Sequence, residues 1–225
     1  MSDKKIAFWF IALLSVLVLV PFLGETIFYS KGEPREAIVA YTMLESGNWI
    51  LPMNYGVEIA YKPPFLYWTI AVISSILGGV SEFSARMPSA LAFLAMQLVF
   101  FSFVAKRKNV KTAFLTSILL LSSFEVHRAA VACRLDMLQV SLIVISLCLL
   151  FRWDEKNCKG VPWLAVLLMA CATLTKGPVG SIFPCLCIGI YQLLRGRSFG
   201  KAFFSLLGIG LLSLIPLGIW FWAAY

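Results

Sequence analysis

The sequence predicts an all-α integral membrane protein with about seven transmembrane helices and a large polar loop after the first of them. Hydrophobic residues make up 60% of the chain and charged residues only 13%, whereas soluble domains have about 45–50% and about 25%. The mean hydropathy is +0.89. The longest polar interval, Ser30–Trp68, lies between apolar runs and holds many of the charges. Charges gathered in one loop of a membrane protein indicate a binding or catalytic site.

The first apolar run, Ile6–Gly24, follows Lys4 and Lys5 and resembles a signal peptide at first sight. It is about 19 residues long, whereas a signal h-region has roughly 7–15, and no small-residue cleavage site follows it. We therefore expect an uncleaved first span with its N-terminus in the cytoplasm.

The next segment, residues 30–78, is predicted to be an outer loop that carries short interfacial helices. Pro34 can open a helix, with Glu33 before it as a cap. The helix is expected over Glu36–Ser46, ended by Gly47. Phe65–Leu77 is apolar but about 13 residues long, which is too short to cross a bilayer.

The distribution of charged residues indicates whether Phe65–Leu77 crosses the membrane. If it stays in the interface, twelve of the 19 Lys and Arg residues fall in short loops on the starting side, and eight of the eleven acids fall on the other, as the positive-inside rule requires. The outer face then carries the polar interval together with Gly78–Arg86, Glu125–Asp136 and Lys176–Gly177. The six later spans are Met87–Ala105, Thr112–Phe124, Met137–Phe151, Val161–Thr175, Val179–Leu194 and Ala202–Trp222.

The remaining composition excludes several classes of function. The net charge of +8 reflects membrane orientation, so no nucleic-acid partner is expected. The six cysteines give no disulfide framework, and the single His127 excludes a His-rich metal site. No cofactor is predicted, and a divalent metal stays an open alternative.

Five segments occur in the order and spacing of a known family: GEPREAIVAYTMLESGNWILP, YKPPFLYW, SARMPSAL, a span-bordering RLD and TKGPVG. In these the chain resembles the polyprenyl-phosphate-sugar-dependent glycosyltransferases of the GT-C fold, nearest to the lipid A aminoarabinose transferase branch and more distantly to protein O-mannosyltransferases. The resemblance implies an inverting enzyme of the bacterial cytoplasmic membrane. It would move a sugar from a polyprenyl-phosphate donor to a lipid A-like glycolipid, a glycan or a protein at the outer face.

The resemblance also implies site residues. The family's first outer loop supplies an acidic pair followed by an Arg, and here these positions hold Gly32, Glu33 and Arg35. Glu33 is thus the one carboxylate in register. Lys62 corresponds to the family's donor-phosphate lysine, and Asp136 to the acid of the second outer loop.

The chemistry agrees with these residue types. Breaking a sugar–phosphate bond develops negative charge on the phosphate, and losing one cationic contact there commonly costs about 3 kcal/mol. A carboxylate can accept the proton of an acceptor hydroxyl, so Glu33 and Asp136 are the predicted catalytic residues. The polyprenyl tail is expected in an apolar groove between the spans and Phe65–Leu77. The predicted phosphate ligands are Lys62, Arg35, Arg128 and Arg134, with Lys176 a candidate anion-binding residue.

Each residue also has a structural alternative. Glu33 could cap a helix, Lys62 could reach toward headgroups, Asp136 could pair with Arg134 or Arg128, and Lys176 could cap its span. For the whole chain the alternatives are a transporter or flippase and an inactive subunit, although charges at one face favour an interfacial enzyme. Residues 1–225 are interpreted as a single transmembrane catalytic domain, the N-terminal part of a longer chain.

Overall fold

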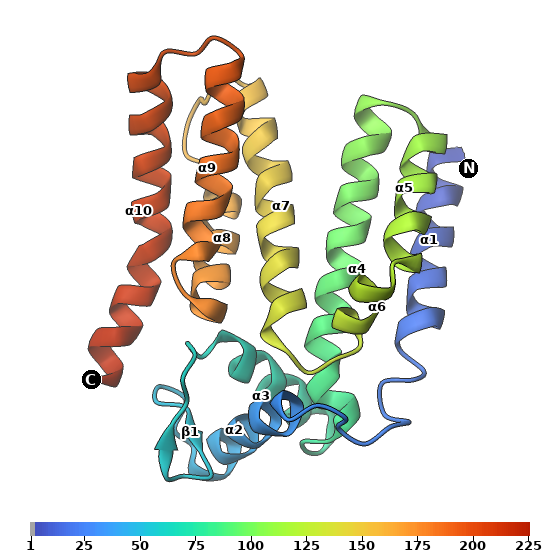
Figure 1. Ribbon diagram of the computed structural model, residues 1–225, viewed down its shortest axis with the longest axis vertical. Helices are drawn as coiled ribbons and strands as arrows, with labels where there is room; N and C mark the ends of the chain where they lie inside the picture. Colours follow the sequence, from blue (N-terminus) through green and yellow to red (C-terminus); the bar gives the residue numbers. More distant parts are fainter. Residues whose placement is uncertain (1–2) are drawn as a thin grey trace.

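The computed structural model describes residues 3–225, and it confirms the predicted all-α membrane fold. Long helices run side by side as a bundle (Figure 1). Their bounds are α1 Asp3–Leu19, α4 Glu82–Arg107, α5 Val110–Ser122, α7 Leu135–Glu155, α8 Trp163–Lys176, α9 Val179–Leu194 and α10 Phe199–Ala224. Within the described residues, three of them, α4, α7 and α10, are long and apolar enough to cross a membrane. The count of seven spans stays a prediction.

A smaller layer lies across one end of the bundle (Figure 1). It consists of α2 (Gly32–Ser46), the two-stranded hairpin β1 (Met53–Asn54) and β2 (Glu58–Ile59), and α3 (Phe65–Leu77). The bounds of α3 are the predicted ones, and its place at the end of the bundle agrees with the prediction that it does not cross. A further short helix, α6 (Phe124–Ala130), precedes α7.

The start of α2 corrects one expectation. The helix begins at Gly32 rather than Glu36, and its N-cap residue, Lys31, makes no side-chain cap hydrogen bond. Glu33 is therefore inside the helix and does not cap it, because its carboxylate is bound to Arg86 instead. The helix ends as predicted at Gly47, which has the left-handed φ of 69° that glycine adopts without strain.

Of the predicted spans, Val179–Leu194 has the expected bounds, and the others differ by one to five residues at their ends, most at the end of α1 and the start of α4. The first helix stops at Leu19 rather than Gly24, because Pro21 disfavours helical backbone at the residue before it. Helix α4 begins five residues before the predicted Met87, since Ser81 and Ser84 form a capping box that satisfies free backbone N–H groups. Arg86 consequently lies on α4 and not in a loop.

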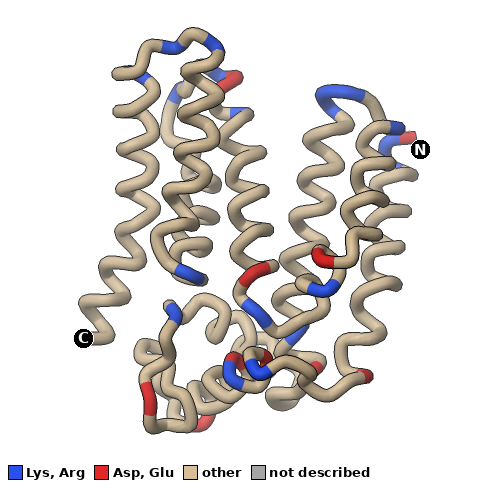
Figure 2. The backbone as a smooth tube through the Cα atoms, viewed as in Figure 1, with Lys and Arg blue, Asp and Glu red and all other residues tan. Residues whose placement is uncertain are grey.

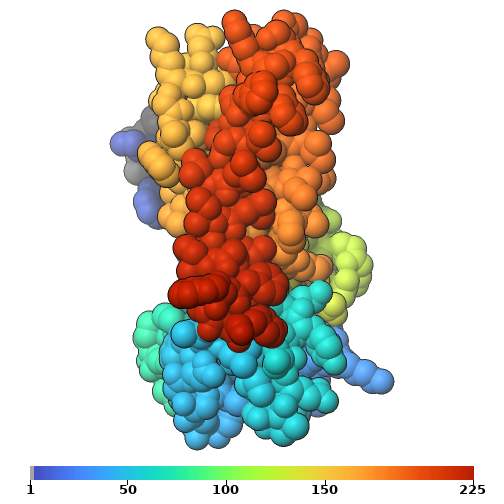
Figure 3. Space-filling model, turned by 90° about the vertical axis from the view of Figure 1, so that its left-hand side faces the viewer, coloured from blue at the N-terminus to red at the C-terminus, as the bar shows by residue number. Residues whose placement is uncertain are grey.

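The end layer is attached to the spans through a shared apolar core. Val39 and Met43 of α2, Leu66 and Ile70 of α3, and Leu138 of α7 belong to one buried cluster. Helix α10 adds a second attachment, because Trp220 Nε1 donates to the carbonyl oxygen of Ile50 at 2.7 Å. Figure 3 shows α10 running the length of one face down to the end layer.

Charge separates along the bundle as the topology argument expects. Basic residues outnumber acidic ones at the end where α4 meets α5 and α9 meets α10, whereas the opposite end carries the two signs more evenly (Figure 2). We call the first the basic end and the second the site end.

Candidate active site

A buried ion pair fixes the start of α2 at the site end. Arg86 Nε donates to Glu33 Oε1 at 2.9 Å, and the two side chains are 1% and 0% exposed. The Arg86 guanidinium also donates to the carbonyl oxygens of Leu23 and Thr26, each at 2.8 Å, and of Ile27 at 3.1 Å. One arginine on α4 therefore holds the whole connection from α1 to α2.

Glu33 is enclosed on its other side by backbone amides. The N–H of Cys133 donates to Oε1 at 3.0 Å and that of Tyr29 to Oε2 at 3.2 Å. Burial raises the pKa of the Glu33 carboxyl, but the bonds from Arg86, Cys133 and Tyr29 outweigh burial, so the pKa lies below its usual value. The structure thus gives Glu33 a full set of protein partners and no exposed surface.

A small hollow of about 10 Å³ brings two predicted phosphate ligands together. Arg35 of α2 and Lys62, which precedes α3, both line it, together with Tyr67 and Asn54. Arg35 Nη2 donates to Glu36 Oε1 at 2.9 Å, which raises the pKa of Arg35. The hollow therefore carries two cations, only one of which has an ion-pair partner among the described residues.

Two oxygen atoms near this hollow are buried without a hydrogen-bond partner in the described residues, Glu36 Oε2 and Asn54 Oδ1. Glu36 is 2% exposed. Burial, and then the charge of Glu36, raise the pKa of Tyr67 far above its usual value, so this phenol stays protonated. Buried acceptors of this kind need donors; the protonated Tyr67 hydroxyl faces Glu36 closely enough to serve as one, whereas no described group donates to Asn54 Oδ1.

Sequence analysis missed Glu36, Asn54 and Tyr67. Glu36 follows the exposed Arg35 and looks like a solvated neighbour. The signal that could have found it is helical spacing, since Glu36, Ala40 and Met43 share one buried face of α2.

The predicted Asp136 lies between two cations at the start of α7. Lys176 Nζ donates to Asp136 Oδ1 at 2.6 Å, and Arg134 Nε lies 3.4 Å from Oδ2. All three side chains are between 39% and 47% exposed, so this cluster, unlike Glu33, is open to a ligand. A Cβ at Gly32 would lie 3.6 Å from Arg134 Nη1, so the position of the family's first acid adjoins this cluster.

Arg128, another predicted phosphate ligand, is not joined to these groups by any hydrogen bond. It pairs with Glu125 on its own helix at 2.7 Å, and the two side chains are 49% and 70% exposed. Among residues 3–225 no three His, Cys, Asp or Glu side chains gather in a way that could hold a metal ion.

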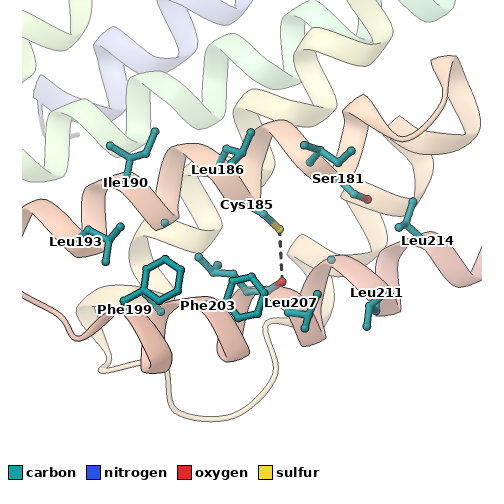
Figure 4. Close-up of a pocket in the computed structure, with 15 residues that line it drawn as sticks. Ser181, Cys185, Leu186, Ile190, Leu193, Phe199, Phe203, Leu207, Leu211 and Leu214 are labelled. Atoms are coloured by element: carbon teal, nitrogen blue, oxygen red, sulfur yellow. Dashed lines mark hydrogen bonds between the residues drawn. The ribbon is translucent and has the colours of Figure 1, made fainter.

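A long apolar groove runs between α9 and α10 (Figure 4). It has a volume of about 430 Å³, and its walls include Leu186, Ile190, Phe203 and Leu207. None of its lining residues comes from α3, so this groove is not the one that the sequence predicted beside Phe65–Leu77.

The bundle, the end layer and the charge pattern together define a multi-span membrane protein with clusters of cationic side chains at one end. Its fold is that of ArnT from Cupriavidus metallidurans. The apo crystal structure matches with a TM-score of 0.82 and 24% identity over 99% of this chain and 42% of that one. The structure bound to undecaprenyl phosphate matches with a TM-score of 0.81 and 23% identity over 96% and 40%.

Sequence comparison assigns the family. Residues 61–220 match the family described as dolichyl-phosphate-mannose-protein mannosyltransferase, and the chain belongs to it. An undecaprenyl phosphate-alpha-4-amino-4-deoxy-L-arabinose arabinosyl transferase of Shewanella sediminis is 34% identical over 75% of this chain and 31% of its own length. A second enzyme with that name, from Proteus mirabilis, is 28% identical over 94% and 38%. The chain thus spans about a third of the length of these relatives.

Proposed function

We propose that this chain is the membrane-embedded, site-bearing part of a glycosyltransferase that takes its sugar from a polyprenyl-phosphate donor. The observation that carries the proposal is the pair of cations, Arg35 and Lys62, lining one hollow at the site end. The names of the relatives and the undecaprenyl phosphate in the similar structure support the same donor.

In this proposal Lys62 and Arg35 bind the donor phosphate. Lys62 acts as a point charge, while Arg35 is oriented by Glu36 and can grip two oxygen atoms. As the bond from the sugar carbon to the phosphate oxygen breaks, the electron pair goes to the phosphate, and both cations stabilise the growing charge. Asn54 Oδ1, which belongs to the lining of the same hollow, would then accept a hydrogen bond from the donor.

The two predicted catalytic carboxylates, Asp136 and Glu33, have different roles in this proposal. Asp136 is exposed and can act as the base. It takes the proton of an acceptor hydroxyl while the oxygen of that hydroxyl attacks the sugar carbon, and the configuration at this carbon is inverted. Glu33, enclosed by Arg86 and two amides, keeps α2 and hence Arg35 in place. Arg134 and Lys176 offer a second anion-binding position beside Asp136, whereas Arg128 lies outside this arrangement and would at most attract anions to it.

The acceptor is a lipid A-like glycolipid, a glycan or a protein, and the reaction takes place at the outer face of a bacterial cytoplasmic membrane. Positive-inside charge supports this orientation, with the N-terminus and the basic end cytoplasmic. The lipid tail of the donor would lie along the apolar flanks of the spans, for which the groove between α9 and α10 offers one surface.

The test measures binding of undecaprenyl phosphate to the purified chain and transfer of a labelled sugar from a polyprenyl-phosphate donor. Lys62→Ala is expected to lower transfer about 100-fold. The matched control is Lys31→Ala, since Lys31 is an exposed lysine of the same loop and should be silent. Absence of undecaprenyl phosphate binding by the unaltered chain would refute the donor class. Equal loss in both variants would refute the assignment of Lys62.

A further inference from the structure

A second hollow, of about 430 Å³, lies at the basic end of the bundle, far from the site end. Helices α1, α4, α7 and α8 all contribute to its walls. It forms where α4 and α7, which are close together at the site end, separate toward the basic end (Figure 1).

Apolar side chains and cations line this hollow together. Phe8, Leu98 and Leu149 are among the apolar lining residues, and Lys4, Lys106, Arg107 and Arg152 are the charged ones. Arg107 is partly neutralised, because its Nη2 donates to Glu155 Oε2 at 2.6 Å. Within residues 3–225 the other three cations have no ion-pair partner, so the lining keeps a clear positive excess.

Arg107 adds an independent observation. Its guanidinium is stacked 3.7 Å above the ring of Phe103, yet its Nε is buried without a hydrogen-bond acceptor among the described residues. An unsatisfied buried donor is costly until an acceptor reaches it, and on a cation an anionic acceptor gives the stronger hydrogen bond. A ligand in the hollow could supply that acceptor, since Arg107 itself lines it.

We propose that this hollow binds one anionic glycerophospholipid, with the headgroup phosphate on Lys106, Arg107 and Arg152 and an acyl chain among Phe8, Leu98 and Leu149. Basic pockets between membrane helices hold anionic lipid headgroups in this way. An amphipathic occupant fits better than a free anion, because a small ion would leave the apolar lining uncovered. The lipid would add contacts to the join between α4 and α7 that Arg107 already makes with Glu155, and it would also touch α1 and α8.

The test uses the purified chain in neutral detergent, with the thermal unfolding midpoint as the readout. Phosphatidylglycerol is expected to raise the midpoint, whereas phosphatidylcholine and inorganic phosphate should not. The double variant Lys106→Gln, Arg152→Gln should bind phosphatidylglycerol about 30-fold more weakly, from about 1 kcal/mol for each basic residue at a membrane surface.

The matched control is Lys108→Gln, Lys111→Gln. It removes the same charge from the same end of the bundle, but neither residue lines the hollow, so the lipid response should be retained. Mass spectrometry of lipids retained after purification gives a second readout if the first double variant is unstable. Equal loss in both double variants, or an equal response to phosphatidylcholine, would overturn the proposal. A full response to inorganic phosphate would show a simple anion site instead.

Discussion

Arg86 has the most hydrogen-bond partners of any site-end cation in the described residues. Comparison with Arg128 shows that two Arg–Glu pairs can contribute very differently to the stability of the protein. Its guanidinium bonds Glu33 and three backbone carbonyls in a fully buried setting. The pair of Arg128 and Glu125 is formed at a similar distance but in solvent. Burial, rather than distance, therefore determines how much stability is lost when each pair is broken.

Replacing Arg86 by methionine should therefore destabilise the protein by about 3–5 kcal/mol, because it leaves Glu33 buried and unpaired. Arg128→Met, the matched control, should leave the stability nearly unchanged, because its pair with Glu125 is formed in solvent. Denaturant titration in detergent measures both. Similar losses in the two variants would contradict the buried-pair account.

The lowered pKa of Glu33 predicts a dependence of stability on pH. In the unfolded chain the Glu33 carboxyl has a pKa of about 4.3. The folded chain stabilises the ionised carboxylate, so its pKa is lower there. Its contribution is complete above the unfolded pKa and is lost as pH falls through the folded pKa. The stability difference between the unaltered chain and Glu33→Gln, measured from unfolding curves, should thus be constant well above about pH 4.3 and shrink only as the pH falls below that value toward the lower folded pKa. A difference that stays constant below this pH as well would show that the ionised form does not matter.

At the scale of elements, Gly180 at the start of α9 lies directly against the backbone of α8, and of the described glycines it leaves the least room for a side chain. A Cβ on Gly180 would lie 2.5 Å from the carbonyl carbon of Ala172 and from the amide nitrogen of Thr173. Ser181 and Ser213 are hydrogen-bonded at 2.5 Å between α9 and α10 in the same region. The three helices are thus packed through small residues, as membrane helices commonly are.

Gly180→Ala should cost about 1–3 kcal/mol, since backbone must move to admit the methyl group. Gly208→Ala is the control, because its Cβ would meet nothing within 4 Å and alanine is the better helix former. Thermal unfolding should show a lower midpoint for the first variant and an unchanged or higher one for the second. A neutral Gly180→Ala would mean that the helices separate without cost.

For the whole molecule, the charge distribution predicts which end faces outward. Val57→Cys at the hairpin tip, where Val57 is 80% exposed, should react with a membrane-impermeant maleimide in spheroplasts. Lys108→Cys at the basic end should react only after permeabilisation, and the unaltered chain measures labelling of the six native cysteines. The reverse pattern would invert the proposed topology.

Run length and charge were sufficient to predict the architecture, but not the contacts. The bounds of α3 and α9 follow directly from where apolar runs meet Gly and Pro. The partner of Glu33 could not be found that way, because Arg86 is 53 residues distant and the Cys133 amide 100 residues distant. Lys62 and Arg35 were predicted by family resemblance alone, and only folding brings both to one hollow.

The bonds of Glu33 also have a consequence for the order of biosynthesis. The carboxylate emerges from the ribosome long before Arg86, and the amide of Cys133 follows only after α5 and α6 have been made. The bond with Arg86 can therefore form first, and the amide of Cys133 completes the set of donors around Glu33 only when the connection between α6 and α7 has been made.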